Sequence, residues 1–509
     1  MQLLHYISDL VHEVGEARIV VAAAGAVVAY AAGLVVYRIW FHPLSKYPGP
    51  KLQAAWYLPH LYHNHVVGDG VRRVARQHVK YGPIVRIGPN HLSIDGSIGW
   101  KDIYAHHAGK EEFRKSVVPT PGADQTLILA PKDAHRRMRR QLAHAFSDAA
   151  LIEQESVVVD YLDLLISRLT ERVGKEINMV SWFNFTTFDI IGDLAFSDPF
   201  DSLASNGYHP WVLSIFKGIR SASQRRFLYS YPILFRLIEM LPASISPVGA
   251  LTILRNNAGS KVTARMEKGE DGGKGRRDFL SYMMRKTRDG KTGMTEDEIR
   301  YSTPTVVIAG SETTATALSG LMFYLKQYPD THDKLVNEIR TSFTSESEIT
   351  MQSTAKLEYL QACLQEILRV YPPVPETPSR LSPGAEVDGE YMPKDVRLSV
   401  YQWATYRNPS HFQDADDFRP QRWLAASHPL YEAKYKDDRR DVVKPFSFGA
   451  RDCIGKNLAN AEMRLMASRL LFRFDYDLSP NQERWHDSQR CFVLWEKGPL
   501  YLTLKNREA

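Results

Sequence analysis

The chain has 509 residues, 44% of them hydrophobic, which is enough for one large core or for two to three ordinary domains. Its net charge of +6 is modest, and no Lys/Arg run interleaved with aromatic residues suggests a nucleic-acid-binding protein. The three cysteines, Cys363, Cys453 and Cys491, exclude a disulfide framework and a C-x-x-C metal site, and they favour a reducing compartment.

The first distinctive segment is residues 19–37, which carry no charge and lie between Arg18 and Arg38. As a helix rising about 1.5 Å per residue, this run just crosses a hydrocarbon core of roughly 30 Å. A signal peptide and a buried core helix are the alternatives, but the run is long for the former and no later segment is as apolar. More basic residues follow the span than precede it, so we expect the C-terminal bulk to face the cytoplasm.

After this span, prolines in residues 42–52 predict a stiff hinge, followed by short strands at 84–87 and 92–94. Amphipathic helices dominate from Asp133 to about Tyr371. Alternating prolines, glycines and β-branched residues between 374 and 400 indicate short strands, and a terminal hairpin is expected around 497–499. The sequence therefore predicts a mainly α fold with a minor β lobe, of the α+β class.

One long helix should begin at Thr295, where Thr295 and Glu298 have the spacing of a capping box, and should end near Gln327. Within it, Ala309 and Gly310 leave a notch in the helix surface, and Glu312 and Thr313 could relay a proton as a general acid does. Ordinary close helix packing and a surface charge are the alternative explanation of the same residues.

The most informative segment is residues 446–455, FSFGARDCIG. Gly449 and Gly455 allow a tight turn and close approach to a flat partner. Cys453 precedes an amphipathic helix, whose N-terminal end favours a thiolate over a thiol. An inert buried cysteine is the alternative.

These residues match F-x-x-G-x-R-x-C-x-G at every fixed position, so the segment resembles the haem-binding loop of the cytochrome P-450 family. The resemblance implies that Cys453 is the axial ligand of haem b, that Phe446 packs near the sulfur, and that Arg451 binds a haem propionate. Residues 309–314 resemble the family's oxygen-activating helix, which makes Thr313 the residue of proton delivery and Glu312 its support. Cys363 and Cys491 are then core residues.

Further residues acquire roles through this resemblance. Glu366 and Arg369, spaced i, i+3 on one helix, look like the family's E-x-x-R pair, and Arg422 would complete a buried structural triad. The other propionate-binding candidates are His135, Arg139 and Arg380; His135 stands where the family has tryptophan. The expected lining of the substrate pocket is Val306, Ala309, Val374, Trp211 and Phe227.

The sequence has no G-x-G-x-x-G fingerprint or flavin module, so electrons must come from a partner. We expect NADPH-cytochrome P-450 reductase, with cytochrome b5 as a second donor, to dock on a basic patch. This patch comprises Arg136, Arg137, Arg140, Lys444 and Lys456.

The resemblance divides the chain into a lumenal N-terminus at 1–18, a transmembrane anchor at 19–41, a hinge at 42–52 and a catalytic haem domain at 53–509. Its expected place is the endoplasmic reticulum membrane. Its expected reaction is O2-dependent hydroxylation or other oxidation of a hydrophobic secondary-metabolite intermediate, as in filamentous fungi. A haem-thiolate isomerase, dehydratase or peroxide-using enzyme is the alternative.

Overall fold

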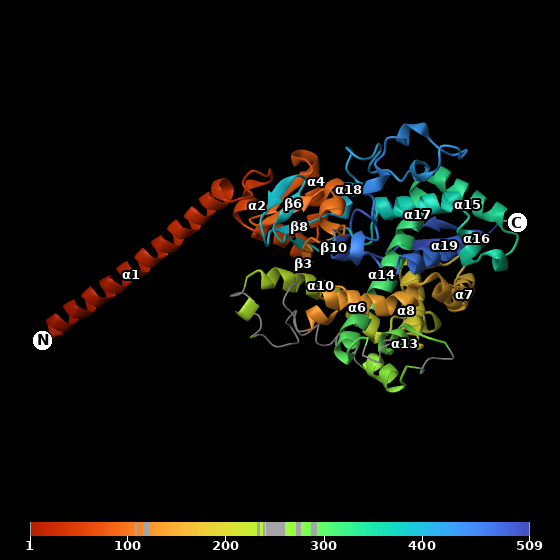
Figure 1. Ribbon diagram of the computed structural model, residues 1–509, viewed down its shortest axis with the longest axis horizontal. Coiled ribbons are helices and arrows are strands. Elements are labelled where there is room, and N and C mark those ends of the chain that lie inside the picture. Colours follow the sequence, from red (N-terminus) through yellow and green to blue (C-terminus); the bar gives the residue numbers. More distant parts are fainter. Residues whose placement is uncertain are drawn as a thin grey trace.

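A long N-terminal helix, α1 (Gln2–Val36), extends away from the rest of the protein in this computed structural model (Figure 1). The structure describes residues 2–106, 109–116, 122–231, 235–237, 240, 260–270, 276–286 and 293–507. The apolar stretch 18–41, which continues into the π-helical turn η1 (Tyr37–Phe41), is 24 residues long with a mean hydropathy of 2.4, and none of it is buried. This stretch is therefore a candidate membrane span. A second long apolar helix, at 296–327, is mostly buried and forms part of the core.

The segment predicted as a hinge, residues 42–52, is packed against the smaller lobe and is not a separate linker. Leu44 is fully buried in the core of that lobe, and α2 (Lys51–Ala55) already begins inside the segment. Arg86 Nη1 donates to the Arg38 carbonyl at 2.7 Å, and Arg38 Nη1 donates to the Ala55 carbonyl at 2.8 Å. The prolines break the helix as expected, but these contacts fix the end of the N-terminal helix to the folded domain.

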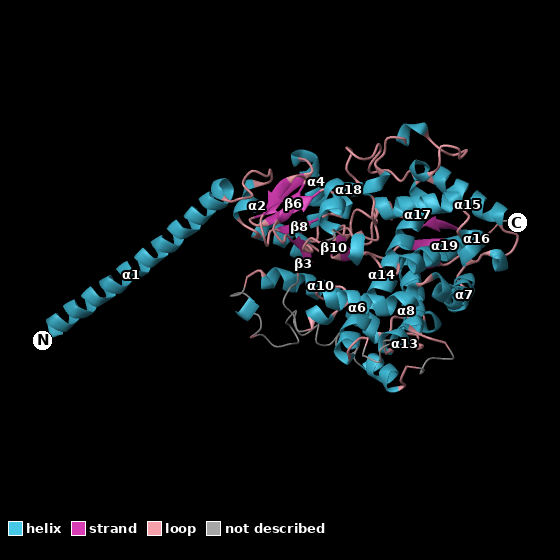
Figure 2. Cartoon of the chain, viewed as in Figure 1, coloured by secondary structure: helices cyan, strands magenta, loops and turns pink. Residues whose placement is uncertain are grey.

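Helices form most of the larger lobe (Figure 2), and α14 (Glu296–Gln327) runs through its centre. The predicted capping box is present at its start, and the helix ends at the predicted residue. α14 packs most closely against α8 (Met179–Phe196) and also contacts α17 (Glu358–Val370) and α19 (Lys456–Arg473). The other helices of this lobe are α6 (Lys132–Ala143), α7 (Asp148–Thr170), α9 (Ser202–Ser205), α10 (Pro210–Tyr229), α13 (Phe279–Met284), α15 (Pro329–Ser342) and α16 (Met351–Thr354).

The smaller lobe, next to α1, holds a five-stranded sheet of order β1-β2-β8-β5-β3. Only the β2–β8 pair is parallel. The strands are β1 (Ile84–Gly88), β2 (His91–Ile94), β8 (Arg397–Ser399), β5 (Arg380–Leu381) and β3 (Arg114–Lys115), with the hairpin β6 (Ala385–Val387) and β7 (Glu390–Met392) beside them. Short helices α3 (Leu58–Tyr62), α4 (Gly70–Tyr81), α5 (Gly96–Gly99) and α18 (Gln402–Tyr406) complete the lobe. The predicted mainly α fold with a minor β lobe is confirmed.

The predicted terminal hairpin around 497–499 is wrong. β10 (Arg490–Phe492) pairs with β11 (Leu494–Glu496), whereas β12 (Tyr501–Asn506) lies between β4 (Glu176–Asn178) and β9 (Phe474–Leu478). The turn signal at Gly498 therefore marks a crossing from one sheet to another. This crossing segment carries Lys497 to the side of α14.

The predicted triad is present and fully buried: the side chains of Glu366, Arg369 and Arg422 are each 0% exposed. Glu366 accepts two hydrogen bonds from Arg369, both at 2.8 Å, and one from Arg422 Nε at 3.1 Å. Burial raises the pKa of Glu366, but the two guanidinium groups outweigh it and hold the pKa below its usual value. Asp438, which sequence reasoning missed, pairs with the other side of Arg422.

The triad generates a stability prediction. Glu366→Gln leaves the buried Arg369 without a carboxylate and Arg422 with Asp438 alone, which should lower the free energy of unfolding by about 3–5 kcal/mol. Arg419→Gln is the matched control, because Arg419 is a partly exposed arginine of the same loop whose pair with Asp417 contributes about 1 kcal/mol or less. Thermal unfolding and haem content of the purified variants measure both effects, and equal shifts would contradict a structural role for the triad.

Candidate active site

A cavity of about 320 Å³ lies between α14 and the loop that precedes α19. Val306, Ala309 and Val374 line it, as predicted. Trp211 instead packs in the core against Phe200, with a centroid distance of 5.1 Å, and among the described residues Phe227 is not part of the lining. These two predictions are wrong, because α10 presents both side chains elsewhere.

Cys453 lies in this cavity at the end of a tight backbone turn. The Cys453 N–H donates to the Phe446 carbonyl at 2.8 Å, and both residues line the cavity. Gly449 has φ +79°, and a Cβ at this position would lie 2.0 Å from the Tyr104 carbonyl oxygen. Only glycine satisfies both the backbone conformation and this close approach. Cys453 is the one cysteine of the three that is exposed, while Cys363 and Cys491 are buried as predicted.

The predicted thiolate is not favoured by the protein alone. Burial among protein atoms raises the pKa of the Cys453 thiol, and the hydrogen bond from the Gly455 backbone only partly opposes this. The helix that was expected to stabilise the thiolate begins three residues later, at Lys456. A bound metal ion would deprotonate such a thiol outright.

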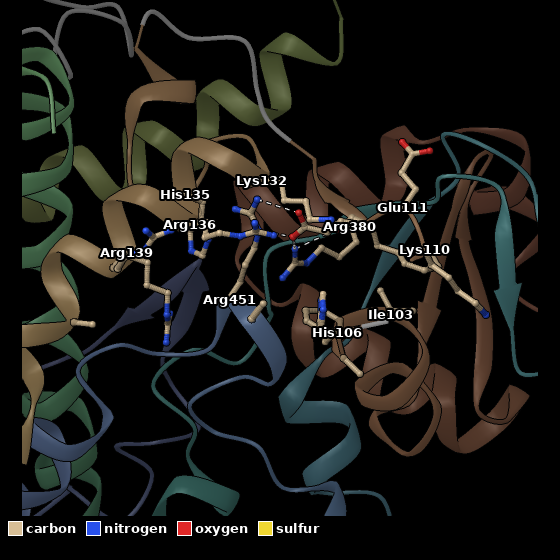
Figure 3. Close-up of a pocket in the computed structure, with 17 residues that line it drawn as sticks. Ile103, His106, Lys110, Glu111, Lys132, His135, Arg136, Arg139, Arg380 and Arg451 are labelled. Carbon is tan, nitrogen blue, oxygen red and sulfur yellow. Dashed lines mark hydrogen bonds and ion pairs between the residues drawn. The ribbon is translucent and has the colours of Figure 1, made fainter. Parts of the chain in front are cut away.

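One end of the cavity is strongly basic. Arg139, Arg380 and Arg451 line it together with His135, all four as predicted, and Lys115 joins them. Figure 3 shows the arginines and His135 around an adjoining hollow of about 530 Å³ that opens beside the cavity.

The charges at this end are not balanced within the protein. Glu112 accepts from Arg451 at 2.5 Å and lies 3.8 Å from Arg380, and Asp452 pairs with Arg139 at 2.5 Å. These two carboxylates face three guanidinium groups and the Lys115 amine, and the buried Arg380 Nε has no hydrogen-bond partner.

Burial first, and the neighbouring positive charges second, lower the pKa values of two members of this cluster. Burial and the neighbouring Arg380 hold the pKa of Lys115 well below its usual value. Burial, then Arg451 and Lys115, lower the pKa of His135 to about 4. The cluster is therefore suited to hold two further carboxylates, such as the propionates of haem.

The two predicted proton-relay residues face different sides of α14. Thr313 lines the cavity, where its hydroxyl donates to the Ala309 carbonyl at 2.6 Å. Glu312 is buried away from this cavity and pairs with Lys497. It therefore neither faces the cavity, as the proton-relay role predicts, nor lies at the surface, as the alternative explanation predicts. Gly310 borders the cavity as predicted, and a Cβ there would lie 2.6 Å from Ile191 Cδ1 of α8, a side chain that also lines the cavity. The notch therefore lies in the cavity wall, where α8 packs against α14.

Glu462 on α19 is a cavity-lining residue that sequence reasoning missed. It is buried and accepts a hydrogen bond from Thr314 Oγ1 at 3.3 Å. With no cation beside it, burial raises the pKa of Glu462 to about 8. The sequence does contain a signal for this residue, because Glu462 is an acidic residue on the otherwise apolar face of the helix that follows Cys453.

The raised pKa of Glu462 predicts a pH-dependent stability. The folded state keeps this carboxyl protonated up to about pH 8, whereas the unfolded chain ionises it above about pH 4.5. The folded state therefore binds the extra proton, and its stability should fall as the pH rises from about 5 to about 8. Glu462→Gln cannot ionise, so its melting temperature should exceed that of the wild type by a margin that grows across this range. The exposed Glu153→Gln is the control, and a margin independent of pH would contradict the assignment.

The cavity as a whole fits a flat, dianionic metal cofactor. Apolar residues of α14 form one wall, the Cys453 thiol is open to the interior, and the basic cluster lies at one end. Thiolate sulfur is a ligand of haem iron, and a cluster with more guanidinium groups than carboxylates fits its propionates. The residues present therefore fit haem.

Comparison with known proteins agrees with this geometry. Residues 48–504 match the family model described as cytochrome P-450. The chain is 39% identical over 496 residues to cytochrome P-450 monooxygenase astA of Talaromyces wortmannii, covering 96% of this chain and 97% of the relative. It is 36% identical over 492 residues to trichothecene C-15 hydroxylase of Fusarium sporotrichioides, covering 95% and 97% respectively. The chain belongs to the cytochrome P-450 family.

Proposed function

We propose that Cys453 supplies the thiolate ligand of the haem iron in a monooxygenase of fungal secondary metabolism that oxidises a hydrophobic intermediate. The observation that carries the proposal is the single exposed thiol, which faces a cavity with a basic end and an apolar α14 wall. When bound, thiolate-ligated haem activates O2, and the electron donation of the sulfur favours O–O cleavage.

The protein's own residues then have distinct tasks. Arg139, Arg380 and Arg451 hold the propionates, with His135 and Lys115 beside them. The Thr313 hydroxyl, which already donates a hydrogen bond on the cavity side of α14, holds and passes a proton.

The apolar lining by Val306, Ala309 and Val374 excludes water and suits a hydrophobic substrate. The name of the Fusarium relative supports hydroxylation as the reaction. Thr313 in the cavity favours oxygen insertion over the alternative of a haem-thiolate isomerase or dehydratase, which needs no proton delivery.

We place the enzyme in the endoplasmic reticulum membrane, with α1 as a single-pass anchor and the catalytic domain on the cytoplasmic side. The exposed apolar stretch 18–41 supports this, as do exposed apolar residues on the elements that follow it. These residues are Trp40, Phe41, Leu52, Trp56 and Leu58. They are positioned to contact the bilayer surface near the anchor.

NADPH-cytochrome P-450 reductase is the proposed electron donor, with cytochrome b5 as a second donor. Arg136, labelled in Figure 3, and Arg140 are exposed and line the hollow, and neither has a carboxylate partner among the described residues. Lys456 is also exposed and lies three residues after Cys453 in the sequence. Arg137 does not belong to the predicted patch, because it forms an ion pair at 2.5 Å with Glu298 in the first turn of α14. An acidic surface would be attracted to the remaining cations.

Reversal of this charge tests the proposed partner. Arg136→Glu combined with Arg140→Glu should slow haem reduction by the reductase about tenfold at low salt and weaken the salt dependence of the rate. The carbonyl spectrum should stay unchanged. Lys80→Glu, on an exposed part of α4, is the control. Stopped-flow reduction kinetics measure the effect, and rates equal to the wild type would reject this docking surface.

A further inference from the structure

A second cavity, also of about 320 Å³, lies on the other side of α14 from the haem cavity. α8 and α10 border it on one side, and the strand pair β10–β11 with the segment that follows it borders the other. Among the described residues, the two cavities have no lining residue in common. A molecule in the second cavity would therefore not compete for space with one in the haem cavity.

Aromatic rings form much of the lining of the second cavity. Tyr208 and Phe216 meet edge to face on one wall, with a centroid distance of 5.5 Å, and Phe492 and Trp495 lie on the β10–β11 wall. Trp495 Nε1 donates to the Pro372 carbonyl at 2.8 Å, so the indole needs no polar partner from the cavity. Such walls favour a flat apolar ring system, which packs against the faces and edges of the aromatic side chains.

Two oxygen atoms in the cavity wall lack a donor. Asn184 and Glu312 both line the cavity and are each 3% exposed, and neither Asn184 Oδ1 nor Glu312 Oε2 has a hydrogen-bond partner. The Asn184 amide nitrogen donates to the Tyr208 hydroxyl at 3.2 Å, which leaves the amide oxygen as the free group. Buried acceptors are nearly always satisfied, so the occupant of this cavity should bring hydrogen-bond donors.

The charges in the lining balance one another. Glu312 forms a buried ion pair with Lys497, and Arg220 forms an ion pair with Glu496 at 3.3 Å in which both side chains are about half-exposed. Tyr208 is the remaining titratable residue of the lining, and burial raises its pKa, which keeps it neutral. In contrast to the basic end of the haem cavity, this lining favours a neutral occupant, since an unpaired charge is costly to bury. The Arg220–Glu496 pair lies at the exposed end, and an exposed pair of this kind opens at little cost.

Water alone fits these walls less well than an organic ring does. Water molecules satisfy buried acceptors where polar partners surround them, and this cavity offers two free acceptors beside a largely aromatic surface. A ring that displaces poorly ordered water from such a surface gains affinity. A cavity of about 320 Å³ also lies within the usual size range of small-molecule sites.

We propose that the second cavity binds a neutral, flat aromatic molecule that carries hydroxyl groups. Its rings pack against the aromatic walls, and its hydroxyl groups donate to Asn184 and Glu312. Because α14 separates this site from Cys453, the molecule bound here is not the one that is oxidised. This inference goes beyond the proposed function and does not depend on it.

The test titrates naphthalene-2,7-diol into the full-length haem protein by isothermal calorimetry, without NADPH. A saturating azole that ligates the iron closes the haem cavity, so that only other sites remain open. One diol should bind per chain, with a Kd of about 10–100 μM. The analogue 2,7-dimethoxynaphthalene has the same rings but no donor, and it should bind about tenfold more weakly.

Two variants assign the binding to this cavity. Asn184→Leu should weaken diol binding about tenfold and change the binding of the dimethoxy analogue little, because it removes one acceptor. Ile219→Trp should abolish the binding of both compounds, because the larger side chain fills the cavity. The matched controls are Asn337→Leu, an exposed asparagine of α15, and Leu213→Trp, an exposed residue of α10 that lines neither cavity.

Three results would overturn the proposal: no diol binding in the presence of the azole, equal affinity for the diol and its dimethoxy analogue, or diol binding that both variants leave unchanged. If Ile219→Trp does not fold, Asn184→Leu and the comparison of the two compounds decide. A wild type without the red-shifted carbonyl complex would contradict the proposed function alone, because the same variants then decide diol binding without the azole.

Discussion

The position of the Cys453 sulfur depends on a backbone turn that only Gly449 can make. The turn places a positive-φ residue directly against the Tyr104 carbonyl, so the loop is held by the smaller lobe as well as by the helix that follows it. The hydrogen bond from Cys453 to Phe446 then closes the turn. Burial raises the pKa of the Cys453 thiol, and the hydrogen bond from the Gly455 backbone opposes this only in part, so a bound metal would supply the deprotonation.

Buried charge organises the surroundings of this loop in three different ways. Around Glu366 the charges are closely paired, and the bonds that it accepts from Arg419, Arg422 and Trp423 hold α17 against the loop at 417–423. At the basic end of the cavity cations are in excess, which prepares the site for an anionic cofactor. On the far side of α14 a single pair, Glu312 and Lys497, leaves one carboxylate oxygen unused. Close pairing thus serves stability and an excess of cations serves binding, whereas the pair on the far side of α14 leaves one buried acceptor open.

The sequence was most informative where function depends on local spacing. The loop at 446–455, the capping box at Thr295 and the E-x-x-R pair at Glu366 all lie within a few residues of chain, and the structure contains each as predicted. The family itself followed from these motifs, and the comparisons confirm it.

The residues that the sequence did not reveal act through long-range contacts. Glu112 and Lys115 reach the basic end of the haem cavity, and Lys497 reaches the far side of α14, from segments whose position depends on the tertiary fold. Glu462 interrupts the apolar face of an amphipathic helix. The misread turn at Gly498 has the same origin, because it joins two sheets in place of one hairpin.

The most direct test of the account is the carbonyl difference spectrum of the reduced protein with and without the Cys453 thiol. The wild type should show the red-shifted band of thiolate-ligated haem, and Cys453→Ser should lose it, while Cys363→Ser, which alters a buried cysteine of α17, should keep it. A Cys453→Ser protein that binds haem and still shows the band would contradict the assignment of this sulfur as the iron ligand.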